Sequence, residues 1–304
     1  MPLSNYVIET DQLSVYYRRH LGIRDIDLKV EKGEVFGFLG PNGAGKTTTQ
    51  RVLLDIIRPT AGTARMFGLD CQKNGVEARQ RVGYLPGELS LYGNMKAHQF
   101  FKMFDSMLGE RAAPNYWKTL AERLQLDTSR KIREFSRGNK QKIGVITAFM
   151  SKAELLVLDE PTSGLDPLVQ QTVLDLVREA KQKGNTVFFS SHILSEVQGV
   201  CDRVGIIREG KLVAVERVED LMHQQFKRLR INFGSMPPGD AFELPGVEEV
   251  GRHENGVMLE IRENLEQVME TTVPYGIKDI ETFSVSLEEI FLAYYGANQG
   301  GEIV

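Results

Sequence analysis

Cysteine is scarce in this sequence, since Cys71 and Cys201 are the only two among 304 residues. They lie far apart, and neither has a histidine or a second cysteine beside it at the spacing of a metal site. A disulfide framework and a cysteine-based zinc site are therefore excluded. This scarcity predicts that the protein works in a reducing compartment.

Long apolar runs are missing as well. None approaches the ~20 residues that a membrane-spanning helix needs. Residues 1–12 (MPLSNYVIETDQ) have neither the basic nor the apolar segment of a signal peptide. We therefore expect a cytoplasmic chain, and any role at a membrane must be supplied by a partner.

The sequence also lacks an excess of positive charge. Its 37 lysines and arginines against 41 aspartates and glutamates give a net charge of −4, which offers no general attraction to nucleic acid. No nucleic-acid partner is expected. The ordinary shares of hydrophobic and charged residues, 41% and 26%, indicate a soluble globular protein. The length allows one large domain and a smaller one.

Short apolar runs alternate with helical patterns over most of the chain, which is typical of an α/β domain with a mainly parallel sheet. Such runs suit strands that are buried on both faces. The clearest predicted strands are 35–39 (VFGFL), 155–159 (LLVLD), 186–191 (TVFFSS) and 203–207 (RVGII). Residues 167–183 predict an amphipathic helix closed by Gly184, and 206–216 predict a hairpin that turns at Glu209-Gly210.

The pattern changes after about Phe226. Short strand-like runs, a breaker cluster at 236–239 (MPPG) and helical patterns at 264–272 and 286–296 surround a further predicted strand, 280–285. We therefore predict a main domain over residues 1–225 and a small α+β appendage over 226–304. Nothing in the appendage has the pattern of a catalytic site, so packing or dimerisation is its expected role.

A glycine-rich loop follows the first predicted strand. GPNGAGKTT (40–48) has the G-x-x-x-x-G-K-[ST] spacing and opens a helical pattern, 47–57. Its glycines let backbone N–H groups surround a polyphosphate at a helix N-terminus. Lys46 can reach the β- and γ-phosphates, and the Thr47 hydroxyl can ligate Mg²⁺. The predicted nucleotide-binding residues here are Gly40, Pro41, Asn42, Gly43, Ala44, Gly45, Lys46, Thr47 and Thr48.

Two acidic residues follow the strand at 155–159. Asp159 ends the strand, where its carboxylate can hold the Mg²⁺ shell, and Glu160 can orient or deprotonate an attacking water. An acid pair at a strand end is by itself often structural. Beside a phosphate-binding loop, the pair indicates hydrolysis of a nucleoside triphosphate.

Residues 135–145 (FSRGNKQKIGV) add a third motif. With the two motifs above, it makes the chain resemble the ATP-binding subunit of an ABC (ATP-binding cassette) transporter, from residue 7 to about 225. Ser136 and Gly138 match the family's signature loop, Leu-Ser-Gly-Gly-Gln, and Ser136 can also cap the next helix. The positions that depart from the commonest residues are Phe135, Arg137 and Asn139. The resemblance implies a P-loop NTPase fold with a helical subdomain at about 88–150.

Three further motifs match the same family. SGLD (163–166) matches the D-loop, whose Asp166 stabilises the site of the facing subunit. His192, just after the strand at 186–191, matches the switch that senses the γ-phosphate. An aromatic ring stacks on adenine in this family, and both Tyr16 and Tyr17 stand near that place. Alternation along a strand does not decide between them, and we prefer Tyr17.

The resemblance also implies an assembly. In this family the signature loop of one subunit closes over ATP held by the other, so two subunits are needed and monomers should be nearly inactive. Each site would use MgATP, with Lys46, Glu160 and His192 as catalytic residues and Thr47 and Asp159 at the metal. The appendage at 226–304, with the segment SLEEIFLAYYG (286–296) near its end, also resembles extensions on bacterial subunits of the exporter type, including drug exporters.

The function predicted in this way is to power an exporter through separate membrane permease subunits. The chain would then lie peripherally on the inner face of the membrane. Two alternatives stay open: a soluble ABC ATPase that does not serve transport, and a weakly hydrolysing regulatory half of a heterodimer. The permease would determine the transported substrate, and the second ATP-binding subunit would form either a homodimer or a heterodimer with this chain.

One motif is anomalous. The family's loop at 82–93 (VGYLPGELSLYG) normally offers a glutamine to Mg²⁺ and water, but Gly87 stands there. One interpretation is a type II turn over residues 85–88, which favours Pro-Gly at its centre. Alternatively, Glu88 or a water replaces the missing ligand. The apolar side chains of residues 89–92 remain available for contact with a permease.

Overall fold

The structure, a computed structural model, describes residues 5–18, 20–223 and 227–283. It divides the chain into two units, residues 1–218 and 219–304. The sequence placed this boundary slightly later, after residue 225. The two units are described separately below.

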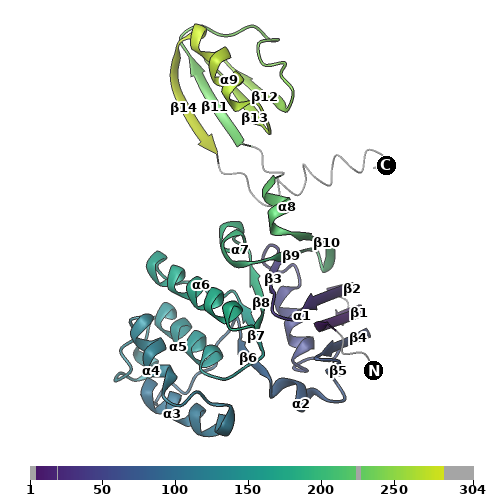
Figure 1. The fold of residues 1–304 in the computed structure, drawn as a ribbon, viewed down its shortest axis with the longest axis vertical. Helices are drawn as coiled ribbons and strands as arrows, with labels where there is room; N and C mark the ends of the chain where they lie inside the picture. The colour runs from purple at the N-terminus through teal and green to yellow at the C-terminus, as the bar shows by residue number, and fades with distance from the viewer. Residues whose placement is uncertain (1–4, 19, 224–226, 284–304) are drawn as a thin grey trace. The chain divides into compact units, whose positions relative to one another are not determined.

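The first unit is built on the predicted, mainly parallel sheet, in the order β10-β9-β3-β8-β7-β6 (Figure 1). Every neighbouring pair is parallel except the β9–β10 hairpin. That hairpin turns at Glu209 and Gly210, which both have positive φ, as a two-residue type I′ turn requires. The strands are β3 (Val35–Leu39), β6 (Val82–Leu85), β7 (Leu155–Asp159), β8 (Thr186–Ser191), β9 (Arg203–Arg208) and β10 (Lys211–Arg217).

A second, antiparallel sheet in the order β2-β1-β4-β5 completes the first unit. Its long strands β1 and β2 pair through several irregularities in register, so their apolar residues do not alternate regularly. Their inward side chains form one core with the helix after β3 and with the parallel sheet. The strands are β1 (Tyr6–Tyr17), β2 (His20–Glu31), β4 (Ala61–Met66) and β5 (Leu69–Asp70).

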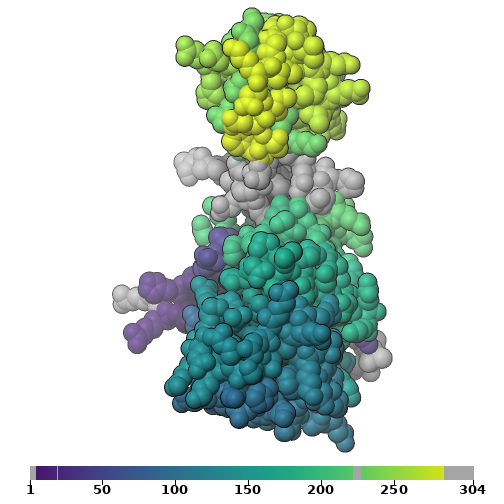
Figure 2. Space-filling model, turned by 90° about the vertical axis from the view of Figure 1, so that its left-hand side faces the viewer, coloured from purple at the N-terminus to yellow at the C-terminus, as the bar shows by residue number. Residues whose placement is uncertain are grey.

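Helices flank the parallel sheet, and those from α3 to α5 form the helical subdomain (Figure 1). In the view of Figure 2, the side chains of this segment, blue to teal, gather together on the surface of the first unit. The α-helices of this unit are α1 (Lys46–Leu53), α2 (Gly75–Arg79), α3 (Ala97–Leu108), α4 (Tyr116–Arg123), α5 (Arg137–Phe149), α6 (Pro167–Gln182) and α7 (Leu194–Val200). Helix α8 (Val218–His223) begins at the boundary between the two units. Two short 3₁₀ helices are η1 (Gly109–Arg111) and η2 (Ile132–Glu134).

Helix α1 is shorter than its pattern predicted. The pattern continued to residue 57, but the helix ends at Leu53 because Asp55 takes a left-handed conformation with φ of 52°. The Ile56 N–H then donates back to the Arg51 carbonyl at 2.8 Å. This closure is typical of a helix C-terminus.

Among its described residues, the second unit contains most of α8, an antiparallel sheet in the order β12-β13-β11-β14 and one further α-helix. Apolar side chains of the sheet and of the helix, including Ile231, Leu259 and Val268, form a separate core. The elements are β11 (Lys227–Phe233), β12 (Val247–His253), β13 (Gly256–Ile261), α9 (Leu265–Thr272), the 3₁₀ helix η3 (Val273–Tyr275) and β14 (Ile277–Phe283). The helix predicted at 286–296 lies outside the described residues.

Neither cysteine is bonded to the other, and burial raises the pKa of the Cys71 thiol to about 12. Cys71 is therefore a neutral, unreactive core side chain at physiological pH. Within the ranges that the structure describes, no helix is both long and apolar enough to cross a membrane.

Candidate functional site

Three parallel strands deliver the predicted site residues to one edge of the sheet. Strands β3, β7 and β8 are neighbours and run in the same direction, so their C-terminal ends lie together. Gly40 follows β3, Glu160 follows β7, and His192 follows β8. Residues from three distant parts of the chain therefore converge where ligands of open α/β sheets bind.

The phosphate-binding loop connects β3 directly to α1. Gly43 and Gly45 have φ of 82° and 110°, a region that disfavours residues with a β-carbon. These conformations turn the loop sharply, and Gly45 becomes the N-cap of α1. The spacing of glycines in the sequence reflects this backbone requirement.

Lys46 turns back over the loop that precedes it. Its ammonium donates to the carbonyls of Gly40 and Pro41 at 2.6 and 3.1 Å. Its Nζ also lies 3.3 Å from Glu160 Oε1, and the side chain is only 6% exposed. A shielded positive charge at a helix N-terminus suits a polyphosphate.

Asp159 is held by two hydroxyl groups. Thr47 Oγ1 donates to Asp159 Oδ2 at 2.6 Å, and Ser190 Oγ donates to Oδ1 at 2.6 Å. The carboxylate is buried, and no shift of register separates β7 from β8 here. Oxygen atoms of the predicted metal ligands, Thr47 and Asp159, are thus already adjacent.

Glu160 has a strained backbone and two polar side-chain neighbours. Its φ of 48° places it in the left-handed region, which is unusual for a residue with a β-carbon. Its N–H donates to the Ser190 carbonyl and hydroxyl at 3.2 and 3.1 Å. Its Oε1 lies 3.2 Å from His192 Nδ1, in addition to the Lys46 contact. The carboxylate therefore lies between the lysine and the histidine.

The signature and D-loop residues begin two other helices. Ser136 is the N-cap of α5, and its hydroxyl accepts from the Asn139 N–H at 3.3 Å. Asp166 is the N-cap of α6 and accepts from the Val169 N–H at 3.1 Å. Ser136, Arg137 and Asp166 are exposed, while Gly138 and Asn139 are partly buried.

The signature loop packs closely on the D-loop. A β-carbon added at Gly138 would lie 2.6 Å from the Gly164 carbonyl oxygen, which is closer than real contacts allow. Glycine at position 138 thus has a local steric reason. The close packing of Gly138 on Gly164 also places Ser136 near the 163–166 segment on the surface.

Comparison with known proteins agrees with this geometry. The sequence model of the family described as ABC transporter matches residues 23–163. The bacitracin transport ATP-binding protein BcrA of Bacillus licheniformis is 38% identical over 211 residues, which cover 68% of each chain. The chain belongs to the ABC transporter ATP-binding proteins.

Two further comparisons are consistent with this membership. The linearmycin resistance ATP-binding protein LnrL of Bacillus subtilis is 34% identical over 223 residues, or 71% of this chain and 70% of that one. A solved ATP-binding subunit of an ABC transporter is 28% identical with a TM-score of 0.64, covering 72% of this chain and 92% of that one. The predicted P-loop NTPase fold is confirmed, and the chain is an ABC ATPase.

The ABC ATPase has its Tyr17 ring beside the phosphate-binding loop. The Tyr17 hydroxyl lies 3.4 Å from Thr48 Oγ1, and the ring covers Gly22, where an added β-carbon would lie 2.8 Å from a ring atom. Tyr17 is 43% exposed and Tyr16 44%, so exposure does not distinguish them. The contact with Thr48 is what places Tyr17 at the nucleotide loop.

The type II turn predicted over residues 85–88 of this ABC ATPase is wrong. Such a turn needs a positive φ at Gly87, and Gly87 does not have one. A β-carbon added there would instead lie 2.8 Å from Asp159 Oδ2 and 3.3 Å from its Cγ. The physical reason for glycine is therefore the close approach of this loop to a buried carboxylate. The adjacent Glu88 side chain is exposed.

We predict that Gly87→Ala impairs the metal site of the ABC ATPase. Because Asp159 is fixed by Thr47 and Ser190, the new methyl group must displace the carboxylate, at a cost of about 1–3 kcal/mol. The Mg²⁺ concentration at half-maximal ATP turnover should then rise by about tenfold or more. Titration of turnover with Mg²⁺ measures this.

Glu88→Ala is the matched control for that titration. Because its carboxylate is exposed, its removal should leave the Mg²⁺ dependence unchanged. A rightward shift in Glu88→Ala alone would instead make Glu88 the substitute ligand and would contradict the steric explanation for Gly87.

Tyr84 in β6 lies close enough to the Asp159 carboxylate for its negative charge to affect the Tyr84 pKa. Burial raises the pKa of Tyr84 to about 12, and the negative charge of Asp159 adds to the rise. The Tyr84 hydroxyl therefore keeps its proton at neutral pH and is not a general base.

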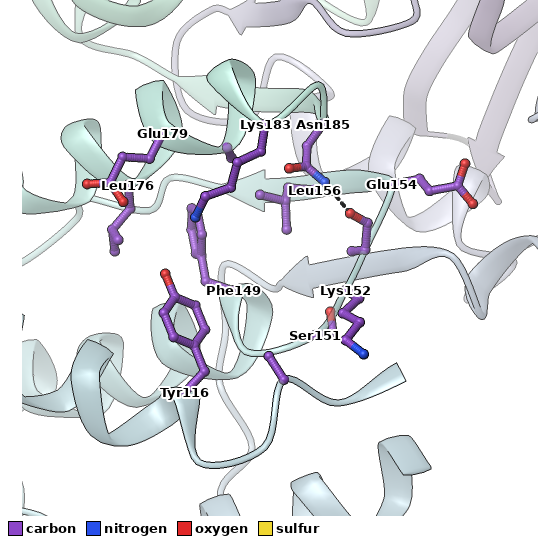
Figure 3. A pocket seen from close by; sticks show the side chains of 13 residues that line it. Tyr116, Phe149, Ser151, Lys152, Glu154, Leu156, Leu176, Glu179, Lys183 and Asn185 are labelled. Carbon is purple, nitrogen blue, oxygen red and sulfur yellow. Dashed lines mark hydrogen bonds between the residues drawn. The ribbon is translucent and has the colours of Figure 1, made fainter. Parts of the chain in front are cut away.

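A cavity of about 460 Å³ lies elsewhere in the ABC ATPase, between α4, the end of α5, β7 and α6 (Figure 3). Phe149, Leu156 and Leu176 give it an apolar lining. Its two carboxylates, Glu154 and Glu179, are each bonded bidentately to an arginine. Since both acids are already ion-paired with arginines, the cavity does not have the free carboxylate of a second catalytic site.

Sequence reasoning missed two residues of the site. Ser190 was predicted only as part of a strand, yet its hydroxyl contacts Asp159 and the Glu160 N–H. Gln141 donates from its Nε2 to the carbonyls of Glu160 and Pro161. No local pattern signals either contact, because each joins residues that are 19 to 31 positions apart.

Proposed function

We propose that this chain is the ATP-hydrolysing subunit of an exporter and that it works as a dimer with separate permease subunits. One observation carries the hydrolytic part of the proposal, namely the Glu160 carboxylate between Lys46 Nζ and His192 Nδ1. A base next to a phosphate-binding lysine and a switch histidine is what in-line attack of water on a γ-phosphate requires.

In this proposal the chain's own residues position and stabilise the reacting groups. The loop at residues 40–48 binds the phosphates with its N–H groups, and Lys46 exchanges its loop carbonyls for phosphate oxygens. Glu160 orients the attacking water and accepts its proton. His192 stabilises the γ-phosphate, and Tyr17 stacks on the base of the nucleotide.

The residues present also fit Mg²⁺. Thr47 and Asp159 offer two hard oxygen ligands that are 2.6 Å apart, and Mg²⁺ commonly takes few protein ligands together with phosphate oxygens and water. When bound, Mg²⁺ would neutralise charge that develops on the phosphates. Ser190 keeps the Asp159 carboxylate oriented for this role.

The proposed dimer rests on the exposure of Ser136 and Asp166. Both begin helices, and the Ser136 hydroxyl with the nearby N–H groups of α5 can face an anion supplied from outside the chain. A second ATP-binding subunit, either another copy or a related chain, would bring its ATP to this loop. The same chain would receive the signature loop of its partner at residues 40–48.

Support for an exporter comes from two relatives, one named for bacitracin transport and the other for linearmycin resistance. The loop after β6 also offers apolar surface to a permease. Tyr92 is 62% exposed and its ring lies beside Phe100, which is buried in α3. Binding there would hold the chain peripherally at the inner face of the membrane.

Copurification from detergent-solubilised membranes tests this proposal. We expect the tagged chain to recover a polytopic membrane protein, and Tyr92→Glu to abolish that recovery by placing a charge in the apolar contact. Val273→Glu, at a similarly exposed apolar residue of the second unit, is the control and should leave recovery unchanged. Recovery of ribosomes or of no membrane protein would favour a soluble ABC ATPase instead.

A further inference from the structure

Gln141 lies on α5, just after the signature residues, and its side chain leaves that helix to contact the end of β7. Its Nε2 donates to the carbonyl of Glu160 at 3.1 Å and to that of Pro161 at 3.3 Å. The residue is 7% exposed, so the amide competes little with water for these carbonyls. A helix that carries the signature loop is thus bonded to the backbone of the proposed base.

The backbone of Glu160, to which Gln141 is bonded, is strained. Glu160 has a φ of 48°, and such a conformation persists only where its surroundings hold it. Ser190 holds the N–H side of Glu160 through its carbonyl and hydroxyl. Gln141 and the Ser163 N–H, at 3.1 Å, hold the carbonyl side.

We propose that Gln141 is a positioning residue that holds the Glu160 carboxylate toward Lys46 and His192 and couples it to the signature helix. This inference rests on the proposed function, because Glu160 is taken as the base. Ser136 and Gln141 belong to the same end of α5, so displacement of this end moves both. ATP of the partner at Ser136 would thereby affect hydrolysis of the ATP in this chain.

A second contact joins α5 to the segment after β7. Gly138 packs against the Gly164 carbonyl so closely that a β-carbon would not fit. The start of α5 therefore contacts the segment after β7 at two places, at Gly164 and at the Glu160-Pro161 carbonyls. Movement of α5 cannot leave residues 160–164 behind without breaking these contacts.

Two variants test the role of Gln141. Gln141→Leu keeps the approximate volume but removes the donor, so kcat for ATP should fall by about ten- to a hundredfold, because small misplacements of a catalytic group are this costly. KM and nucleotide affinity should change by less than about twofold, since Gln141 does not touch the phosphate-binding loop residues described above. Gln171→Leu, which removes an exposed glutamine bonded to Asp175, is the control and should retain full activity.

Gln141→Glu adds a readout that a merely structural role would not give. Only the protonated carboxyl can donate to a carbonyl, so kcat relative to the wild type should rise as pH falls. A pH profile that parallels the wild type would overturn the proposal. So would a wild-type kcat in Gln141→Leu.

Hydrogen exchange separates this inference from the proposed function. In Gln141→Leu, the Ser163 amide should exchange faster than in the wild type, because the turn from Glu160 to Ser163 loses the side chain that holds its carbonyls and therefore opens more often. Unchanged exchange would overturn the inference whether or not the chain hydrolyses ATP. Faster exchange in a chain whose wild type hydrolyses no ATP would keep the contact and reject only the proposed function.

Discussion

Glu160→Gln should lower the rate of ATP hydrolysis by more than about a hundredfold, because a positioned general base contributes this much or more. The amide keeps the size of the side chain and the strained backbone, which is held by Ser190 and Gln141. It loses the negative charge that lies 3.3 Å from Lys46 Nζ and 3.2 Å from His192 Nδ1. ATP binding should persist, since the loop at residues 40–48 is untouched.

The measurement compares steady-state turnover with equilibrium binding of a fluorescent ATP analogue. Glu154→Gln is the control, since Glu154 precedes the same strand that Glu160 follows and is bonded to Arg81. It should keep full turnover. Near-normal hydrolysis by Glu160→Gln would remove Glu160 from the role of base.

Lys46→Ala should remove most of the affinity for ATP. Charged hydrogen bonds are worth about 1.5–3 kcal/mol, so the dissociation constant should rise by about ten- to a hundredfold, with turnover lost as well. The loss of ATP affinity has a second cause. Without the ammonium, the Glu160 carboxylate and the carbonyls of Gly40 and Pro41 lose a shared positive neighbour.

Lys183→Ala is the matched control for that binding measurement. Lys183 lies over the Tyr116 ring beside the cavity of Figure 3, and its removal should leave ATP affinity unchanged. An unaltered affinity in Lys46→Ala would contradict the placement of the phosphates at the loop.

The parts of the fold that sequence predicted well are those in which short-range chemistry dominates. The runs at 35–39, 155–159 and 186–191 are buried strands, as their short length and largely apolar composition predict. The glycine spacing of the phosphate-binding loop reflects backbone conformation at Gly43 and Gly45. Each of these two sequence patterns, the apolar run and the glycine spacing, is contained within a few consecutive residues.

Other parts depend on contacts between distant residues. The sequence does not predict the bounds of strands β1 and β2, because irregular pairing interrupts the alternation of their apolar residues. Pro86-Gly87 has the composition of a type II turn, but the approach of Asp159, from a strand 72 residues away in sequence number (159 − 87), is what requires glycine. Gln141 shows the same limit, since its burial against Glu160 is set by the packing of α5 on β7.

We propose that hydrolysis needs two chains, because the signature loop at residues 136–139 acts on ATP held by a partner. The most direct measurement is the ATPase rate per chain as the concentration of the isolated chain increases. We predict a rate that is very low in dilute solution, rises with concentration and reaches a plateau as dimers form. A rate per chain that does not depend on concentration, or no hydrolysis at any concentration, would show that ATP hydrolysis does not arise from a dimer of this chain.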